Sequence, residues 1–532
     1  MKSARTTIVA VGLLPLALAA CSGGGSGGTA GAGGKPVDGR TFTLAIAADP
    51  GTLDPQLTSL SVAFQADAFL YDSLVSVDAS GKEVAGLAAA WQGDASTATY
   101  TLRKGVTCSD GTPLTASVVA RNVNWVADPQ HGSAKTGLNV PAGAKATADD
   151  AAGKVTVTSP TPDAFLARDV GGLPIVCPKG MQDRDLLKRG SSGTGMFTLT
   201  QAVADDHYTL TRRKDYAWGP GDWKPGVRGL PDTVVLRVVQ NEATAANLLL
   251  AGQINAAMII GQDKARVAAR HGFQRALRAP LGEMWFDERP GGPAADPAVR
   301  RALTQALDLA QLRTVVTSGD GRAPTGMVAS GQGPCTQDTV TGALPSYDPS
   351  AAAAALDAAG WKAGPGGVRS KDGKKLSLLF TYPSSRGAPL QTGAELLRTF
   401  WQKIGAQVTL KGATDSQLGQ SVIGGQGSWD AAFVPLTVTL PTQVVPFVSG
   451  PTPPKGGNFA FIDNPGYAAH VKAASALPGT KGCAEWAAAE KALFQRTDVV
   501  PFADELTPIF AGGATFELAD AAISPSSIRM LG

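Results

Sequence analysis

The sequence predicts an α/β protein with more than one lobe. Its 532 residues exceed what one ordinary hydrophobic core organises, so we expect two or more lobes. In the second half, a strand pattern at 376–382, a helix pattern at 394–404 and a strand pattern at 405–410 alternate. Such alternation is typical of an α/β lobe. The apolar content of 43% is normal for a globular protein.

The charge balance argues against nucleic acid as a partner. Only 17% of the residues are charged and the formal net charge is +3, without the strongly basic character of a nucleic-acid-binding domain. The chain is therefore expected to have no nucleic-acid partner.

The first residues predict export and a lipid anchor. Lys2 and Arg5 precede a short apolar stretch, which ends in the string Leu-Ala-Ala-Cys at Cys21. We interpret 1–20 as a lipoprotein signal peptide and Cys21 as the lipidated residue; an ordinary secretory signal is the alternative. Residues 22–34 are only Gly, Ser, Thr and Ala, so 21–40 is predicted to be a flexible tether that reaches roughly 20 Å.

The body of the chain opens with alternating elements. Residues 41–47 alternate as a strand, and 64–71 form a helix pattern after a loop at 49–55. A strand at 100–102 leads into the turn at 109–113, where Gly111 tolerates positive φ. Thr115 is then a good N-cap for a helix with Val118, Val119 and Val123 on its apolar face. Later strands are expected at 154–158 and 234–239, and helices at 242–251, 350–359 and 485–497.

Several strings in this order resemble one known family. Residues 102–122 read LRKGVTCSDGTPLTASVVARN, 52–55 read TLDP, 70–75 read LYDSLV, and 193–197 read GTGMF. Together they resemble the family 5 extracytoplasmic solute-binding proteins, the dipeptide- and oligopeptide-binding receptors of ABC importers. The resemblance extends over about 41–510. Two departures are Cys108, where the family usually has Phe, and Ser117, near its usual acidic helix-start residue.

This resemblance implies a two-lobed, periplasmic-binding-protein-like fold of type II, cluster C, with a hinge between the lobes. The first lobe would comprise 41–85, 191–281 and 505–532, with an inserted subdomain at 86–190. The second lobe would comprise 282–504. Four cysteines remain after Cys21, and an exported chain with an even count suggests disulfides. Of three possible pairings we favour Cys108–Cys177 and Cys335–Cys483, because each pair then stays inside one proposed lobe.

Enzyme motifs are weak in this sequence. The G-x-S-x-G string at 24–28 falls in the tether, whereas a nucleophile elbow needs a strand-to-helix turn. The four histidines are widely scattered, and no C-x-x-C or H-E-x-x-H spacing exists, so we predict no catalytic residue, no metal site and no cofactor.

Three regions are candidates for the walls of a ligand cleft, which needs apolar surfaces and a few fixed polar groups. The first is the loop from Asp49 to Ser61, followed by Phe64. The second is the pair Trp285 and Phe286. The third is the segment 429–441, from which we select Leu436, Thr437 and Thr439. Arg386, in a loop after the strand at 376–382, is a further candidate for holding a carboxylate or phosphate.

One departure in the third region bears on the ligand. In the peptide-binding members that this chain resembles, an Asp nine positions after Asp430 receives the α-ammonium group of the peptide. Thr439 stands there instead, so the buried countercharge for an ammonium group is missing on this wall. The change favours a neutral or amphiphilic ligand, or a peptide held by backbone contacts.

The resemblance implies a monomeric receptor on the outer face of the cell membrane. It would capture a peptide or peptide-like ligand by lobe closure and pass it to the permease subunits of an ABC importer. Three alternatives stay open: the same fold binding a neutral oligosaccharide, chelate or amphiphile; a sensing lipoprotein without a transport role; and an extracellular hydrolase.

Overall fold

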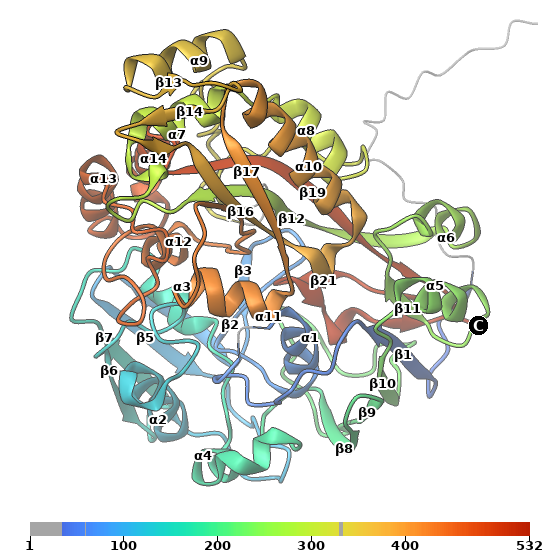
Figure 1. The fold of residues 1–532 in the computed structure, drawn as a ribbon. Coiled ribbons are helices and arrows are strands. Elements are labelled where there is room, and N and C mark those ends of the chain that lie inside the picture. The colour runs from blue at the N-terminus through green and yellow to red at the C-terminus, as the bar shows by residue number, and fades with distance from the viewer. Residues whose placement is uncertain (1–33, 59, 329–332) are drawn as a thin grey trace, which may run out of the picture.

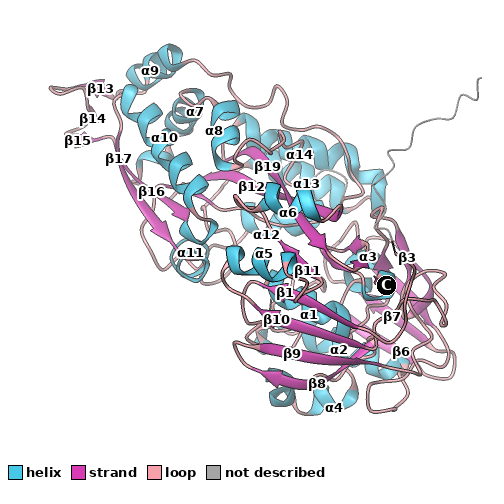
Figure 2. Cartoon of the chain, turned by 90° about the vertical axis from the view of Figure 1, so that its right-hand side faces the viewer, coloured by secondary structure: helices cyan, strands magenta, loops and turns pink. Residues whose placement is uncertain are grey.

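The computed structural model describes residues 34–58, 60–328 and 333–532. Within them, one sheet runs through two lobes in the order β17 (Gln407–Ala413), β16 (Ser377–Pro383), β18 (Ala431–Phe433), β12 (Phe273–Phe286), β19 (Val499–Ala511), β11 (Ala256–Met258), β1 (Thr41–Ile46), β10 (Thr233–Val238), β9 (His207–Arg212) and β8 (Phe197–Val203). The long strands β12 and β19 pair antiparallel and pass from one lobe into the other (Figures 1 and 2). We call them the hinge strands.

The first lobe lies at the lower right of Figure 1 and contains both ends of the described chain. Strand β1 pairs in parallel with β10 and β11, and β8 and β9 extend the sheet as an antiparallel edge. Pro36 forms a bridge with Leu531, so the start and the end of the fold are joined. The helices and small strands of the first lobe are α1 (Ser61–Leu70), α5 (Glu242–Leu250), α6 (Lys264–Arg270), β20 (Ala514–Thr515), β21 (Leu518–Ala519), β22 (Ala522–Ile523) and β23 (Arg529–Met530).

A smaller subdomain packs beside the first lobe. Its antiparallel sheet has the order β4 (Ala88–Gly93), β5 (Thr97–Leu102), β7 (Lys154–Thr158) and β6 (Lys145–Asp149). Helix α2 (Ala116–Ala127) starts where the sequence predicts, because the Thr115 side chain accepts a hydrogen bond from the Val118 N–H. Val118, Val119 and Val123 are buried. The remaining elements are α3 (Leu166–Gly171), α4 (Pro178–Gln182), β2 (Val75–Val77) and β3 (Glu83–Ala85).

The second lobe covers its part of the sheet with helices. Strand β16 pairs in parallel with β17 and β18, and β18 pairs antiparallel with β12. The helices are α7 (Pro297–Gln305), α8 (Leu309–Val316), α9 (Pro349–Ala358), α10 (Ala388–Lys403), α11 (Asp415–Leu418), α12 (Pro441–Val448), α13 (Pro465–Ser475) and α14 (Cys483–Gln495). A small sheet is formed by β13 (Lys362–Ala363), β14 (Arg369–Lys371) and β15 (Lys374–Lys375).

Short helical turns complete the described elements. They are η1 (Pro129–His131), η2 (Arg184–Lys188), η3 (Pro293–Ala295), η4 (Ser384–Arg386), the π-helical turn η5 (Gly419–Ile423), η6 (Gly479–Gly482) and η7 (Pro525–Ser527).

Two disulfides hold segments of the described chain that are far apart in sequence. Cys108 bonds to Cys177 within the subdomain, across a sequence separation of 69. Cys335 bonds to Cys483 within the second lobe, across a separation of 148. These are the two pairs that we favour from the sequence. Each closes a long loop and thereby restricts the unfolded chain.

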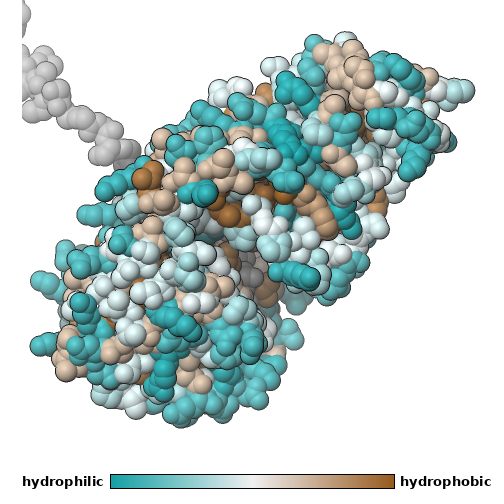
Figure 3. All heavy atoms as spheres, turned by 90° about the vertical axis from the view of Figure 1, so that its left-hand side faces the viewer, coloured by the Kyte–Doolittle hydropathy of each residue, from teal (hydrophilic) through white to brown (hydrophobic). Residues whose placement is uncertain are grey.

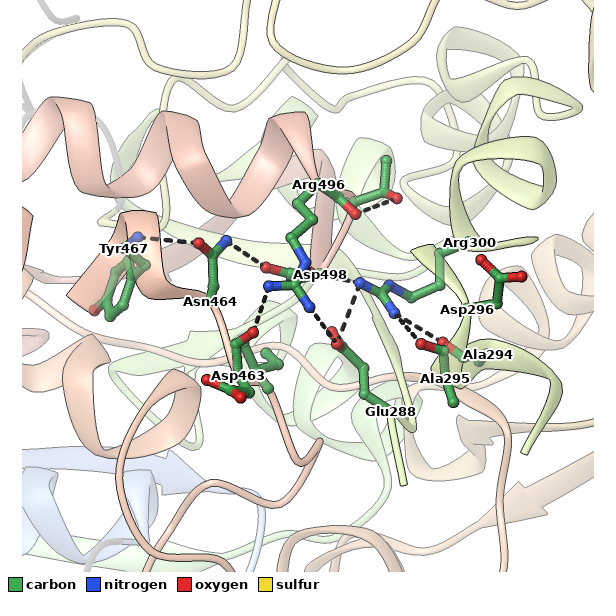
Figure 4. A network of polar contacts seen from close by, with 12 residues as sticks. Glu288, Ala294, Ala295, Asp296, Arg300, Asp463, Asn464, Tyr467, Arg496 and Asp498 are labelled. Carbon is green, nitrogen blue, oxygen red and sulfur yellow. Dashed lines mark hydrogen bonds and ion pairs between the residues drawn. The ribbon is translucent and has the colours of Figure 1, made fainter. Parts of the chain in front are cut away.

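A buried ionic network fixes the N-terminal part of α7 against the chain that follows α14 (Figure 4). The Arg300 guanidinium donates to the Asp498 carboxylate, Nη2 to Oδ1, at 2.7 Å and lies 3.2 Å from Glu288 Oε2. Asn464 donates to the other oxygen of Asp498 at 2.7 Å. Arg496 approaches both Glu288 and Asp498 from the partly exposed side. Because a buried charge must be paired, this network determines how helix and strand meet in the second lobe.

Candidate ligand-binding site

A cavity of about 290 Å³ lies between the first lobe with its subdomain and the second lobe. The hinge strands contribute Arg278 and Leu506 to its lining, α3 contributes Arg168, and the chain before α12 contributes Thr439. The turn between β21 and β22 contributes Asp520. We call this space the cleft cavity. Figure 3 shows the surface hollowed between the two bodies on this face of the molecule.

The second lobe contributes Thr439 to the lining of the cleft cavity, on an extended segment, Val434–Leu440, that is held by β12. Glu283 accepts a hydrogen bond from the Val434 N–H through its backbone oxygen at 3.0 Å. Its carboxylate accepts another from the Leu436 N–H at 2.8 Å. The Trp285 indole donates to the Val434 oxygen at 2.9 Å. Alternate side chains then face opposite ways: Leu436 is buried, Thr437 is exposed and Thr439 is half-buried at the cavity.

Trp285 and Phe286 occupy a different place from the one that the sequence suggests. Both side chains have 0% exposed surface and pack in the core of the second lobe, not on the cleft wall. The reason is their strand: β12 is covered on both sides, so its last residues face helices and loops of the lobe. Through its hydrogen bond to Val434, Trp285 helps to hold the segment that carries Thr439. Leu436, at 8% exposed, is likewise mainly a core residue.

The loop that begins at Asp49 is fastened to the first lobe. Asp49 accepts hydrogen bonds from the Asp205 N–H at 2.8 Å, the Tyr208 hydroxyl at 2.7 Å and the Gly51 N–H at 2.7 Å. Burial alone would raise the pKa of Asp49, but these hydrogen bonds outweigh it and hold the pKa below its usual value. The Asp49 carboxylate accepts these three hydrogen bonds from the protein itself, so we interpret its role as structural.

Phe64 has an unexpected partner. The Lys135 ammonium lies 4.2 Å from the centroid of its ring, and Lys135 is only 7% exposed. One helical turn further along α1, Asp67 is 5% exposed, and neither of its carboxylate oxygens has a hydrogen-bond partner in the described structure. Burial raises the pKa of Asp67 well above its usual range and lowers the pKa of Lys135.

The two bodies touch at the subdomain side of the cleft. Thr442 of α12 donates to Asp169 of α3 at 3.2 Å, and the Gly479 N–H donates to the Ala164 oxygen at 2.7 Å. Phe165 packs with Leu440 and Trp486 in one apolar cluster. These contacts join the subdomain to the second lobe, so the cleft is bridged on this side.

The remaining predicted positions lie outside the described structure. Cys21 precedes the first described residue, and the side chains of Ser61 and Arg386 are also outside the description. Conversely, sequence reasoning missed Arg168 and Asp520, which line the cleft cavity. They come from separate segments, and no local spacing relates them.

In the described ranges, no group of three or more His, Cys, Asp or Glu side chains is arranged to hold a metal ion. Likewise, none of the described helices is both long and apolar enough to cross a membrane.

Comparison with known proteins places this geometry among solute receptors. The model of the bacterial extracellular solute-binding proteins, family 5, matches residues 82–444. Protein XP55 of Streptomyces lividans is 29% identical over 388 residues, which cover 70% of this chain and 67% of XP55.

Two solved structures align with almost the whole fold. A substrate-binding protein of Microbacterium hydrocarbonoxydans, complexed with 4-hydroxybenzoate hydrazide, superposes with a TM-score of 0.76 at 28% identity, covering 92% of this chain and 99% of the other. The oligopeptide-binding protein AppA of Bacillus subtilis, in complex with a nonapeptide, superposes with a TM-score of 0.73 at 18% identity, covering 94% and 100%.

Proposed function

Since the chain belongs to the bacterial extracellular solute-binding proteins of family 5, which deliver ligands to ABC importers, we propose that it is a lipid-anchored receptor for a short peptide or peptide-like solute. The ligand is captured in the cleft cavity by closure of the lobes and handed to the permease subunits. Cys21 is the proposed lipid-bearing residue, and the receptor works as a monomer.

The observation that carries this proposal is the position of the cleft cavity. It lies between two bodies that are linked by neighbouring strands of one sheet, β12 and β19, and those strands also line it. A ligand that contacts Thr439 from one body and Arg168 from the other favours the closed arrangement by its contacts to both. Closure changes the surface offered to a permease, which couples ligand binding to docking.

The peptide-like ligand is the family default, and the size of the cavity supports a short one. At about 290 Å³ the cavity is at the small end of the usual range for small-molecule sites. The polar side chains around it suit a ligand with charged or hydrogen-bonding ends. Thr439 offers no countercharge to an ammonium group, so such a group would need another partner.

A small non-peptide ligand is the second candidate. It is favoured by the likeness, at 28% identity, to a receptor that was solved with an aromatic hydrazide. Oligosaccharides and chelates belong to the same alternative, and a sensing role without transport would use the same binding step.

Binding is tested by isothermal titration and thermal unfolding of the purified full chain. The panel holds di- to pentapeptides, oligosaccharides, metal chelates, and aromatic acids and hydrazides. A ligand at 100 times its dissociation constant is expected to add about 2.7 kcal/mol to the free energy of unfolding. Stabilisation by peptides supports the first candidate. Stabilisation by the aromatic compounds, without any by peptides, supports the second, and no stabilisation by any member contradicts both.

The anchor is tested separately in cells by Cys21→Ser. The wild-type chain is expected to sediment with membranes and to incorporate a labelled fatty acid, and the variant is expected to do neither. A variant that still incorporates the label contradicts the role of Cys21.

A further inference from the structure

An acidic side chain is buried where the subdomain touches the second lobe. Asp169 of α3 is 4% exposed, and its Oδ2 accepts a hydrogen bond from the Thr442 hydroxyl of α12 at 3.2 Å. Its other oxygen, Oδ1, has no hydrogen-bond partner among the described residues. One hydroxyl donor compensates a carboxylate poorly for the loss of water, so burial here favours the neutral acid. We call the pair Asp169 and Thr442 the interlobe contact.

The charges near Asp169 also favour its neutral form. Burial is the main cause that raises the pKa of Asp169 well above its usual range, and the negative charge of Asp163, just before α3, is the next. Glu83 adds to the same effect, and Arg168 opposes it. Arg168 also forms a long ion pair with Glu83, with Nη1 3.8 Å from Oε1, which weakens its action on Asp169.

The ionisable groups of the other neighbouring elements are engaged elsewhere. The Tyr100 hydroxyl of β5 donates to a backbone oxygen of α3 at 2.8 Å, and burial raises the pKa of Tyr100 well above its usual range, so it stays neutral. Helix α12, with the sequence PTQVVPFV, has no ionisable side chain. His470 of α13 and Glu485 of α14 pair with each other at 2.7 Å, and Lys481, in the turn between those helices, is exposed.

The burial of Asp169 depends on the second lobe. Thr442 contacts its carboxyl group directly, and beside this contact Phe165 of the subdomain packs with Leu440 and Trp486 of the second lobe. When the lobes move apart these contacts are lost, and we expect water to reach Asp169. Its pKa then returns towards the ordinary value of 3.8. The closed arrangement therefore holds a proton more tightly than the open one.

The interlobe contact adjoins the cleft cavity. Arg168, the residue before Asp169, lines the cavity from the subdomain, and Thr439, three residues before Thr442, lines it from the second lobe. A ligand that joins Arg168 to Thr439 therefore favours the same arrangement of the two bodies as the interlobe contact does.

We propose that the interlobe contact is a pH switch for lobe closure: closing buries Asp169 against Thr442 and adds one proton from solvent, and opening returns that proton. The inference rests on the lobe motion of the proposed function and adds its regulation. The proton is held on Oδ1, the oxygen that accepts no hydrogen bond. Because proton and ligand favour the same closed form, each raises the affinity for the other, and ligand affinity rises as the pH falls.

The pH range of the switch follows from the two forms. Below the ordinary pKa of 3.8, Asp169 is protonated whether the lobes are open or closed, so pH does not affect closure. Above it the open form loses the proton while the closed form keeps it. The equilibrium constant for closing then falls with rising pH, by at most about tenfold per pH unit, until the closed form loses its proton as well.

The distance between two spin labels measures closure without any ligand. The labels are attached at Lys154→Cys in β7 and Lys472→Cys in α13, which replace exposed residues of the subdomain and of the second lobe. The full chain carries Cys21→Ser, and its other four cysteines form disulfides, so only the two new thiols react. We expect the ratio of open to closed molecules to rise about tenfold or more from pH 5 to pH 8.

Four variants identify the group that titrates. Asp169→Asn keeps the shape of the neutral acid and should make the ratio independent of pH. Asp163→Asn removes the neighbouring charge, so the ratio should still depend on pH but change at lower pH. Thr442→Asp places a second carboxylate across the contact and should steepen the dependence; it decides if Asp169→Asn fails to fold. Asp222→Asn, at an exposed acid, is the matched control and should behave as the wild type.

The outcomes separate this inference from the proposed function. A wild-type ratio that does not vary with pH, or a pH dependence that survives in Asp169→Asn, overturns the switch. The same labelled chain is then mixed with the ligand panel. A ligand that closes the wild type and Asp169→Asn equally at pH 5 and at pH 8 also overturns the switch and leaves the receptor function intact. If pH changes the wild-type ratio but no panel member does, the switch stands and the proposed receptor function fails.

Discussion

Arg300 and Asp498 form an ion pair that is closed off from solvent in the second lobe, with Nη2 2.7 Å from Oδ1 and no exposed side-chain surface on either residue. The pair joins α7, which follows the first hinge strand, to the start of the second hinge strand. The pair therefore links the segment by which the chain enters the second lobe to the segment by which it leaves. Glu288 and Arg496 extend the pair into a network of two cations and two carboxyl groups (Figure 4).

Breaking this pair from one side should be costly. Arg300→Met leaves Asp498 buried without its main partner, and we expect the free energy of unfolding to fall by about 3–5 kcal/mol. Urea denaturation measures this change. Arg301→Met, on the exposed face of the same helix, is the control and should change the value little. A loss in Arg300→Met no larger than in the control would contradict the structural role of the pair.

Glu288 should make stability depend on pH. Burial and the neighbouring Asp498 raise the pKa of Glu288 to about 9, against two arginines that lower it. Between pH 4.5 and about pH 9, Glu288 therefore keeps a proton in the folded chain that it has lost in the unfolded chain. The stabilisation is complete below pH 4.5 and declines as the pH rises towards 9, by at most about 1.4 kcal/mol per unit.

Glu288→Gln removes that titration, so the urea midpoint of the variant should depend less on pH between 5 and 9 than that of the wild type. Glu395→Gln, a partly exposed glutamate of the same lobe, is the control. Parallel pH profiles of wild type and Glu288→Gln would show that Glu288 is ionised in the folded protein.

Gly282 should be intolerant of a side chain. A Cβ at this position would lie 2.7 Å from the Ala503 Cβ and 2.7 Å from two ring atoms of Phe502, both on the neighbouring hinge strand. The register of β12 and β19 shifts on both sides of Gly282. We expect Gly282→Ala to lower stability by about 1–3 kcal/mol.

The matched control is Gly272→Ala, just before the same strand, where a Cβ meets nothing within 4 Å. Thermal unfolding compares the two variants, and small-angle scattering with and without ligand reports whether Gly282→Ala also alters closure. Equal stability of the two variants would mean that the hinge strands adapt to the added methyl group.

The Cys108–Cys177 disulfide should contribute several kcal/mol. It closes a loop with a sequence separation of 69, and the chain-entropy estimate for such a loop is about 4 kcal/mol. Cys108→Ala combined with Cys177→Ala should lose about that amount in urea denaturation. Mild reductant should lower the free energy of unfolding of the wild type far more than that of the double variant. The comparison requires that Cys335–Cys483 stays intact in both proteins, which mass spectrometry can verify. Unchanged stability in the double variant would contradict the prediction.

Local elements of this fold are readable from the sequence because local rules determine them. The strand expected at 41–47 is β1, the helix expected at 242–251 is α5, and the N-cap at Thr115 is used as predicted. The helix expected at 394–404 begins earlier, at Ala388, because Pro389 favours the first turn and Gly393 is enclosed against Val316.

Long-range features were harder to predict. Strand β12 over Phe273–Phe286 is not readable from its own residues, because Pro280 and Gly282 disguise its alternation and pairing with β19 maintains it. The same limit applies to the site. Thr439 was found through a resemblance that spans the segment, whereas Arg168 and Asp520 line one cavity only because distant segments converge. The division into lobes by residue number stays a prediction.

The pairing of Trp285 with Val499 has a consequence for how such receptors diversify. The chain leaves the first lobe on one hinge strand and returns on its neighbour, so everything between them is a single excursion whose two ends are adjacent. An excursion of this kind can be exchanged as one cassette, with only two junctions to match. Grafting it from a relative would replace Thr439, while Arg168 and Asp520 on the other side of the cleft cavity stay with the recipient.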